Sequence, residues 1–85
     1  MKVRILTPQA VVFDDEAVEV VLPGVGGVVS VMDSHQDIVC ALTRGEIVLR
    51  RPAPVSGGSP LESFAVAHGV AQVVDGILLV MEEPA

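Results

Sequence analysis

Ser34, His35 and Asp37 are the residues whose types come closest to a catalytic set, since serine, histidine and aspartate form the triad of many hydrolases. A working triad converges from distant parts of a fold, whereas neighbours in an extended segment point in opposite directions. Asp33 and Ser34 are also residue types that hydrogen-bond nearby backbone groups in turns. We therefore interpret residues 33–36 as a turn.

Histidine and cysteine, which ligate transition metals, are scarce in the sequence. The candidates are His35, His68 and Cys40, and no two of them have C-x-x-C or H-x-H spacing. No aspartate or glutamate completes a recognisable ligand set around them. The sequence predicts no metal site, and we interpret His68, which precedes Gly69, as a residue at a strand end.

The glycine-rich segment Gly24-Val25-Gly26-Gly27 resembles a phosphate-binding loop only superficially. A phosphate loop ends in Gly-Lys-Ser/Thr and leads into a helix whose N-terminus holds the anion. The dinucleotide fingerprint needs a third glycine where Val29 stands, and the residues that follow are typical of a strand. We therefore expect no nucleotide and no other cofactor.

The acidic residues Asp14, Asp15, Glu16 and Glu19 could supply paired carboxylates for acid–base catalysis. No pocket signal accompanies them, and short runs of charge are usually solvated turns. We interpret residues 14–16 as a polar turn. No set of residues in this chain predicts an enzyme.

Composition and charge exclude several kinds of partner. The net charge is −6 with only 5 lysines and arginines, whereas binding to nucleic acid or to an anionic membrane surface requires clustered basic residues. The longest uncharged stretch, Val20 to Met32, is interrupted by proline and glycines and is shorter than the roughly 20 apolar residues of a membrane span. A single cysteine and no visible signal peptide favour a cytoplasmic protein without direct insertion into lipid.

Hydrophobicity and turn spacing predict an all-β fold. The 85 residues suffice for one domain, residues 1–85, and valine is the most frequent residue, which favours strands. Turn signals recur often enough for a small flattened β-sandwich or barrel of about eight to ten short strands without a helical domain. The expected strands include residues 2–7, 17–22, 28–32, 38–42, 46–51, 63–67, 70–74 and 77–81. Between them we expect a loop at 23–27, a flexible loop at 52–60, a hairpin turn at Asp75-Gly76 and a polar tail at 82–85.

The expected strands carry more apolar residues than one sandwich interior needs. Alternate residues of each strand point to opposite faces, and the following apolar residues fall on the side expected to face outward: Val21, Val39, Ala41, Val48, Ala65, Ala67, Leu78 and Val80. A contiguous apolar set on one sheet indicates a protein interface, because monomers expose at most a few hundred Å² of such surface. The alternative is a barrel-like shape, or strand bulges that bury some of these residues.

Three blocks, in order along the chain, are similar to one known family. The first comprises Val3-Arg4-Ile5-Leu6-Thr7-Pro8, Val11-Val12-Phe13-Asp14 and Val18-Glu19-Val20-Val21-Leu22-Pro23-Gly24. The second comprises Gly27, Val29, Val31, Met32, His35, Ile38, Ala41 and Leu42, followed by Arg44-Gly45. The third comprises Phe64-Ala65-Val66 and Gly69-Val70-Ala71-Gln72-Val73. Over essentially its whole length, the chain resembles the N-terminal β-sandwich domain of the epsilon subunit of F-type ATP synthases.

The resemblance implies a non-catalytic rotor subunit in the central stalk, linking the gamma subunit to the membrane c-ring in proton- or sodium-driven ATP synthesis. It would be peripheral, at the cytoplasmic face of a bacterial inner membrane. We expect contacts with gamma at Thr7, Val39, Ala41, Ala65 and Ala67. We expect the loop that faces the c-ring at Gly24, Val25, Gly26, Gly27 and Val28, together with His35.

The sequence departs from the family pattern in two respects. In the segment between Pro23 and Gln36, Val28 stands where the family commonly has an acidic residue, and the Pro-Gly pattern around His35 is altered. In the family, two C-terminal helices would follow Ala85; if the chain ends there, we expect a subunit without that inhibitory, ATP-sensing element. The altered segment motivates an alternative, a free-standing β-sandwich adaptor derived from this family.

Overall fold

The chain forms eight strands, seen in a computed structural model that describes residues 1–33, 36–52 and 59–85. The strands are β1 (Lys2–Leu6), β2 (Val11–Glu16), β3 (Glu19–Gly24), β4 (Gly27–Met32), β5 (Ile38–Leu42), β6 (Gly45–Arg50), β7 (Leu61–Val74) and β8 (Ile77–Pro84). Within these ranges there is no helix, and hence none that is long and apolar enough to cross a membrane. The predicted all-β fold of short strands is confirmed.

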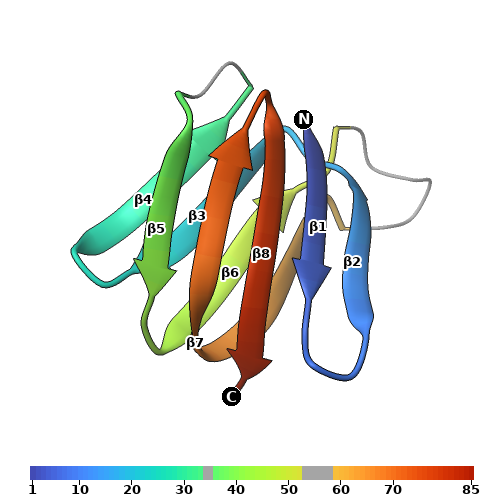
Figure 1. Cartoon of the computed structure of the whole chain (residues 1–85). Helices are drawn as coiled ribbons and strands as arrows, with labels where there is room; N and C mark the ends of the chain where they lie inside the picture. Colours follow the sequence, from blue (N-terminus) through green and yellow to red (C-terminus); the bar gives the residue numbers. More distant parts are fainter. Residues whose placement is uncertain (34–35, 53–58) are drawn as a thin grey trace.

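The strands lie in two layers that share β7 (Figure 1). In the front sheet the order is β2-β1-β8-β7-β5, with β1 parallel to β8 and the other neighbours antiparallel. In the back sheet, β4 pairs with β3, β3 with β6, and β6 with residues 61–66 of β7. The C-terminal half of β7 pairs with β5 and β8. The fold is therefore a flattened sandwich in which one long strand passes from the back sheet to the front sheet.

A β-bulge marks the point where β7 changes sheets. The register between β7 and β8 shifts between Val66 and His68, which leaves Ala67 as the extra residue. Val66 is buried before the bulge, and Ala71 and Val73 are buried after it, so the parity of the inward side chains reverses there. The prediction of two strands, 63–67 and 70–74, was wrong because the glycine between them does not interrupt the strand.

Gly69 remains in the ladder because it lies very close to β8. A Cβ atom at this position would lie 2.5 Å from the carbonyl oxygen of Met81 and 2.9 Å from the Cα of Glu82. Only a residue without a side chain permits this approach. Gly69 is therefore a site of close strand packing rather than a break.

Aliphatic side chains from both sheets fill the interior. The fully buried large residues are Val3, Ile5, Val20, Leu22, Val31, Ile47, Leu49, Val66, Val73, Leu78 and Val80. Val21 and Val48, expected to face outward, are only partly buried, whereas their neighbours Val20 and Ile47 are fully buried, so the faces assigned to these two strands are confirmed. The placement of Leu78 and Val80 on the outward side was wrong, since both have 0% exposure.

The turn before β8 explains this reversed parity. Asp75 and Gly76 have φ values of 51° and 75°, as in a two-residue hairpin turn, and they pair Val74 directly with Ile77. Val74 and Ile77 both face outward, so Leu78 and then Val80 face the interior. A shift of one residue reverses every side chain of a strand. The predicted hairpin at Asp75-Gly76 is confirmed, although the parity we assigned to the following strand was not.

Three segments expected to be irregular are strand. Residues 14–16 belong to β2, and residues 82–84 extend β8 instead of forming a polar tail. Pro23 and Gly24 end β3, and Gly27 begins β4, so the loop expected at 23–27 is a turn at Val25 and Gly26. Their polar or glycine-rich composition was misleading because backbone pairing with a neighbouring strand continues through them. The loop expected at 52–60 lies mostly outside the described residues.

Candidate docking surfaces

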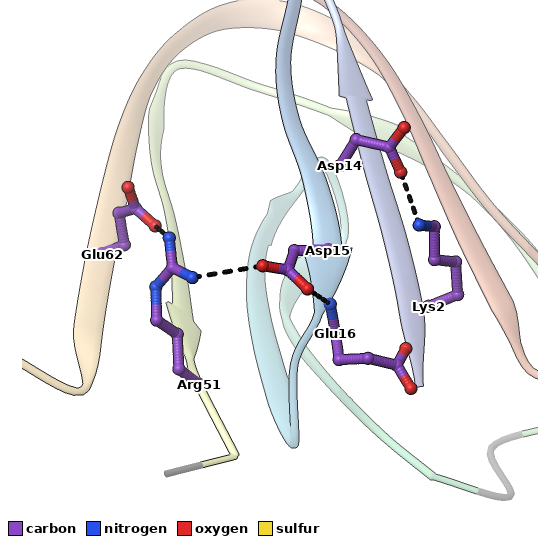
Figure 2. Close-up of polar contacts among 6 residues, drawn as sticks. All are labelled: Lys2, Asp14, Asp15, Glu16, Arg51 and Glu62. Atoms are coloured by element: carbon purple, nitrogen blue, oxygen red, sulfur yellow. Dashed lines mark hydrogen bonds and ion pairs between the residues drawn. The ribbon is translucent and has the colours of Figure 1, made fainter. Parts of the chain in front are cut away.

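Two acidic residues of β2, Asp14 and Asp15, form ion pairs with basic side chains (Figure 2). The Nζ of Lys2 lies 2.8 Å from Oδ1 of Asp14, and the Nε of Arg4 lies 3.5 Å from its Oδ2. The hydrogen bond from Lys2 lowers the pKa of the Asp14 carboxyl below its usual value. An ionised, exposed and ion-paired carboxylate does not suit proton transfer. This cluster stabilises a sheet edge and forms no catalytic pair.

Arg51 connects β2 of the front sheet to β7 of the back sheet. Its guanidinium lies 2.7 Å from Oε2 of Glu62 and 3.5 Å from Oδ2 of Asp15 (Figure 2). It also lies over the ring of Phe13, 5.3 Å from the centroid, and that ring meets Phe64 edge to face at 6.0 Å. The chain's two aromatic residues and this arginine thus pack at the side of the sandwich where β2 approaches β6 and β7.

The residues considered for a triad or a metal site do not converge where the structure describes them. Ser34 and His35 lie outside the described residues. Oδ1 of Asp37 accepts a hydrogen bond of 3.1 Å from the backbone N–H of Asp75, so Asp37 supports the β7–β8 turn. Cys40 packs against the core from β5, whereas His68 is exposed on β7. In the described part of the chain, no three histidine, cysteine or acidic residues could hold a metal ion.

The outer side of the front sheet is largely apolar. Across its strands, Ala41 lies opposite Val70, Val70 opposite Met81, and Met81 opposite Leu6. We call the following residues the front face: Leu6, Val39, Ala41, Val70, Val74, Ile77, Leu79 and Met81. Val39 is 74% exposed, and Val70, Val74, Ile77 and Met81 are each at least 40% exposed. The same side also carries Gln72, opposite Val39 and Leu79, and Arg4, opposite Leu79. The apolar residues around them form a patch of the kind that marks a protein interface.

The five residues expected to contact gamma do not share one surface. Val39 and Ala41 lie on the front face, whereas Ala65 lies opposite Glu46 on the outer side of the back sheet. Ala67 is the half-buried residue of the bulge. Thr7 lies just beyond β1, where its hydroxyl oxygen accepts hydrogen bonds of 3.3 and 3.2 Å from the N–H groups of Gln9 and Ala10.

Sequence reasoning missed most of the front face. Leu78 and Val80 were placed on the outward side of their strand, so the outward-facing Ile77, Leu79 and Met81 were not recognised. The signal that could have found them is the hairpin itself, because a two-residue turn at Asp75-Gly76 requires Val74 and Ile77 to be paired.

The β3–β4 turn forms a protruding tip, defined here as residues 24–28. The backbone N–H of Val25 donates to the carbonyl of Ala41 at 2.9 Å, which ties the turn to β5. Val25 is 69% and Val28 is 77% exposed. Together with β5, the tip borders a groove of about 540 Å³ whose lining includes Val39 and Ala41. Because these two residues also belong to the front face, the tip and the front face are continuous.

A second hollow, of about 380 Å³, lies where β1 ends and β7 bulges. We call it the Glu82 recess, lined by Leu6, Thr7, Pro8, His68, Gly69, Met81, Glu82 and Glu83. Glu82 is only 6% exposed, and its Oε2 has no hydrogen-bond partner. Burial raises the pKa of its carboxyl above the usual value for glutamate. The sequence did not reveal this residue because it was assigned to a polar tail.

Comparison with known proteins identifies the family. Residues 1–85 match the family described as ATP synthase, Delta/Epsilon chain, beta-sandwich domain. The chain belongs to this family. The resemblance inferred from the three sequence blocks is confirmed.

Among curated relatives, the ATP synthase epsilon chain of Gloeothece citriformis is 37% identical over 73 residues, covering 86% of this chain and 49% of the relative. That of Sulfurimonas denitrificans is 31% identical over 85 residues, covering 100% of this chain and 62% of the relative. The chain thus spans about half to three fifths of the length of these relatives.

Two solved structures share the fold. One is a chain of the mitochondrial ATP synthase central stalk and c-ring of Tetrahymena thermophila, which is 16% identical to this chain. Its TM-score is 0.79, and the match covers 96% of this chain and 62% of that chain. The other is a chain of the Euglena gracilis mitochondrial ATP synthase, which is 17% identical to this chain. Its TM-score is 0.80, and the match covers 96% of this chain and 51% of that chain. The β-sandwich of this chain is therefore the fold found in ATP synthase assemblies.

Proposed function

We propose that the chain is a non-catalytic subunit in the central stalk of an F-type ATP synthase, linking a gamma-type subunit to the membrane c-ring. Relatives at 31–37% identity are named ATP synthase epsilon chains, and a structure with the same fold comes from a central stalk and c-ring. The complex would be driven by protons or sodium ions, with this subunit peripheral at the cytoplasmic face of a bacterial inner membrane.

The observation that carries the proposal is the apolar front face. In the isolated chain, Val39, Val70 and Met81 expose apolar surface to water. Covering it with a partner is favourable at roughly 25 cal/mol per Å² before the costs of association. We propose that gamma covers this face, with Val39 and Ala41 among its contacts and Thr7 at its border. Ala65 and Ala67 would then contribute less, because Ala65 lies on the other sheet and Ala67 is half buried.

The tip is the proposed contact with the c-ring. It is continuous with the front face through Val39 and Ala41, so a subunit bound to gamma by that face would present residues 24–28 at its border. The exposed side chains of Val25 and Val28 give the tip an apolar character. His35, also expected at this contact, lies outside the described residues.

The architecture suits a part that transmits torque. β7 belongs to both sheets, Gly24 of β3 pairs with Leu42 of β5, and Arg51 with Phe13 and Phe64 joins β2 to the back-sheet part of β7. The layers are thus held together by backbone pairing through β7 and between β3 and β5, and by side-chain packing between β2 and β7. A body braced in this way resists the shear that would otherwise dissipate rotation between its two contacts.

Co-expression tests the proposal. The chain and the gamma subunit from the same genome should co-purify as a stable complex when only one of them carries an affinity tag. Lack of a complex, with both proteins folded by circular dichroism, would contradict the stalk assignment. It would favour the free-standing adaptor, whose gene would also lie outside an ATP synthase gene cluster.

A further inference from the structure

β5 is an edge strand of the front sheet, and one of its sides is largely unpaired. It pairs with β7 along its whole length, whereas on its other side, within the described residues, only Leu42 is paired, with Gly24 of β3. The carbonyl of Ala41 accepts the N–H of Val25 at 2.9 Å and therefore points away from β7. Backbone groups alternate in direction along a strand, so the N–H and carbonyl of Val39 point to the same open side. At Val39, β5 thus presents a backbone donor and acceptor with which no described strand is paired.

The two edges of the front sheet differ in their protection. Proteins usually protect edge strands with charged residues, proline or a bulge, because unpaired backbone groups can recruit a further strand. The β2 edge carries Asp14, Asp15 and Glu16, and Arg51 connects it to β7. β5 has the sequence Ile-Val-Cys-Ala-Leu, and its pairing with β7 continues without a register shift. It therefore lacks all three kinds of protection and is open to strand addition.

The groove between the tip and β5 lies along this open edge. Its volume is about 540 Å³, and it is bordered by β5 and the β3–β4 hairpin, which lie beside each other at one side of the sandwich (Figure 1). The residues that line it, 24–29 and 38–41, carry no charge. Val29, Ile38 and Cys40 are partly buried against the core and give the groove an apolar floor. An extended segment placed here would alternate its side chains between this floor and the front side while its backbone pairs with Val39.

We propose that gamma, docked on the front face, adds an extended strand to β5 at Val39 and fills the groove with apolar side chains of that strand. Val39 and Ala41 belong both to the front face and to the lining of the groove, so a protein that covers one surface reaches the other. A second copy of the chain is disfavoured, because each copy has a net charge of −6. The site thus selects a partner segment that is extended, apolar and uncharged. This inference rests on the proposed function in taking gamma as the partner on the front face.

Hydrogen–deuterium exchange of backbone amides tests the added strand in the unmodified protein. In the free chain, the Val39 amide should exchange rapidly although it lies in a strand, and binding of gamma should slow it by at least about tenfold. The amide of Cys40 is the control, because it points to β7 and should be protected in both states. An unchanged rate at Val39 in the gamma complex would overturn the proposal. Protection of Val39 that grows with the concentration of the free protein would identify a second copy as the occupant and would also overturn it.

Two substitutions at Val39 separate backbone pairing from burial of the side chain. Val39→Pro removes the N–H and keeps an apolar side chain, and an edge strand tolerates proline where that N–H lies outside the ladder. Val39→Ala keeps the N–H and removes apolar surface. In calorimetric titrations, Val39→Pro should bind gamma at least about fivefold more weakly than Val39→Ala, because a carbonyl of the added strand loses its donor. Equal affinities, or weaker binding by Val39→Ala, would show that only the side chain contacts gamma.

These measurements distinguish the added strand from the stalk assignment. If wild-type protein binds gamma without protection of the Val39 amide, the strand proposal fails while the stalk assignment stands. If wild-type protein does not bind gamma at all, both are overturned. If circular dichroism shows that Val39→Pro does not fold, the exchange measurement on wild-type protein decides alone.

Discussion

The carboxyl group of Glu82 lies at the inner side of β8, where burial raises its pKa above the usual glutamate value. The sequence could not reveal this, because Glu82-Glu83-Pro84 has the composition of a solvated tail. What makes it a strand is backbone pairing with β7, in which Glu82 lies opposite Gly69. The residues found correctly from the sequence were those whose environment depends on local pattern, such as Val3 and Ile5 in an alternating strand.

The raised pKa of Glu82 predicts a specific pH dependence of stability. Between the pKa of the unfolded chain, near 4.5, and the higher pKa of the folded state, the folded protein binds more protons. The free energy of unfolding contributed by this group therefore falls as pH rises through that window. Glu82→Gln should abolish the loss and stabilise the protein at pH 8 by about 1–3 kcal/mol.

Urea denaturation of both proteins from pH 4 to pH 8 measures this effect. The lowered pKa values of the exposed Asp14 and the partly buried Glu19 act in the opposite direction, but they are common to both proteins and cancel in the difference. Glu83→Gln is the control and should change stability at pH 8 by less than about 0.5 kcal/mol. A difference between wild type and Glu82→Gln that does not grow with pH would contradict the burial of this carboxyl.

Gly69 yields a prediction about close packing. In Gly69→Ala the new Cβ would lie 2.5 Å from the Met81 carbonyl oxygen, so backbone must move. We expect destabilisation of about 1–3 kcal/mol in chemical denaturation. Gly26→Ala is the matched control, because nothing lies within 4 Å of its Cβ position, and its effect should be within about 0.5 kcal/mol. Equal effects of the two substitutions would show that β7 and β8 are not this close.

At the scale of elements, the sequence predicted most strands but neither the long β7 nor the parity of β8. The two errors have different causes: Gly69 was interpreted as a break although the strand continues through it, and the face that each β8 residue presents depends on the pairing across the Asp75-Gly76 hairpin. The candidate interface depended on that parity. Val39 and Ala41 were correctly expected to face outward because their strand alternates regularly, whereas Ile77 and Met81 were missed.

The contact between β2 and the back sheet gives a prediction about Arg51. Arg51→Ala removes a cation over the Phe13 ring together with the ion pair to Glu62. We expect a loss of about 1–2 kcal/mol in the free energy of unfolding. Arg50→Ala removes only a more exposed pair with Glu19 and should cost less than about 1 kcal/mol. Equal losses in thermal and urea unfolding would mean that Arg51 does not join the sheets.

At the scale of the whole molecule, composition and turn spacing were enough for the fold class, and three sequence blocks were enough for the family. The surplus of apolar residues also indicated a docking surface. The side of the sandwich that carries this surface can be found only from the pairing of the strands in the structure. Val39 and Ala65 come from strands with the same alternating pattern but lie on different sheets. The central claim is that gamma binds the front face.

Two arginine substitutions on β7 test that claim most directly. Val70 lies on the front face, and Ala65 lies on the outer side of the back sheet, so the same charge is added to opposite surfaces from one strand. Binding of each variant to the gamma subunit is measured by isothermal titration calorimetry, after circular dichroism confirms that both are folded. Val70→Arg should weaken binding by at least about tenfold, because an unpaired charge would be buried, and Ala65→Arg should bind like wild type. Normal binding by Val70→Arg together with loss of binding by Ala65→Arg would contradict the account.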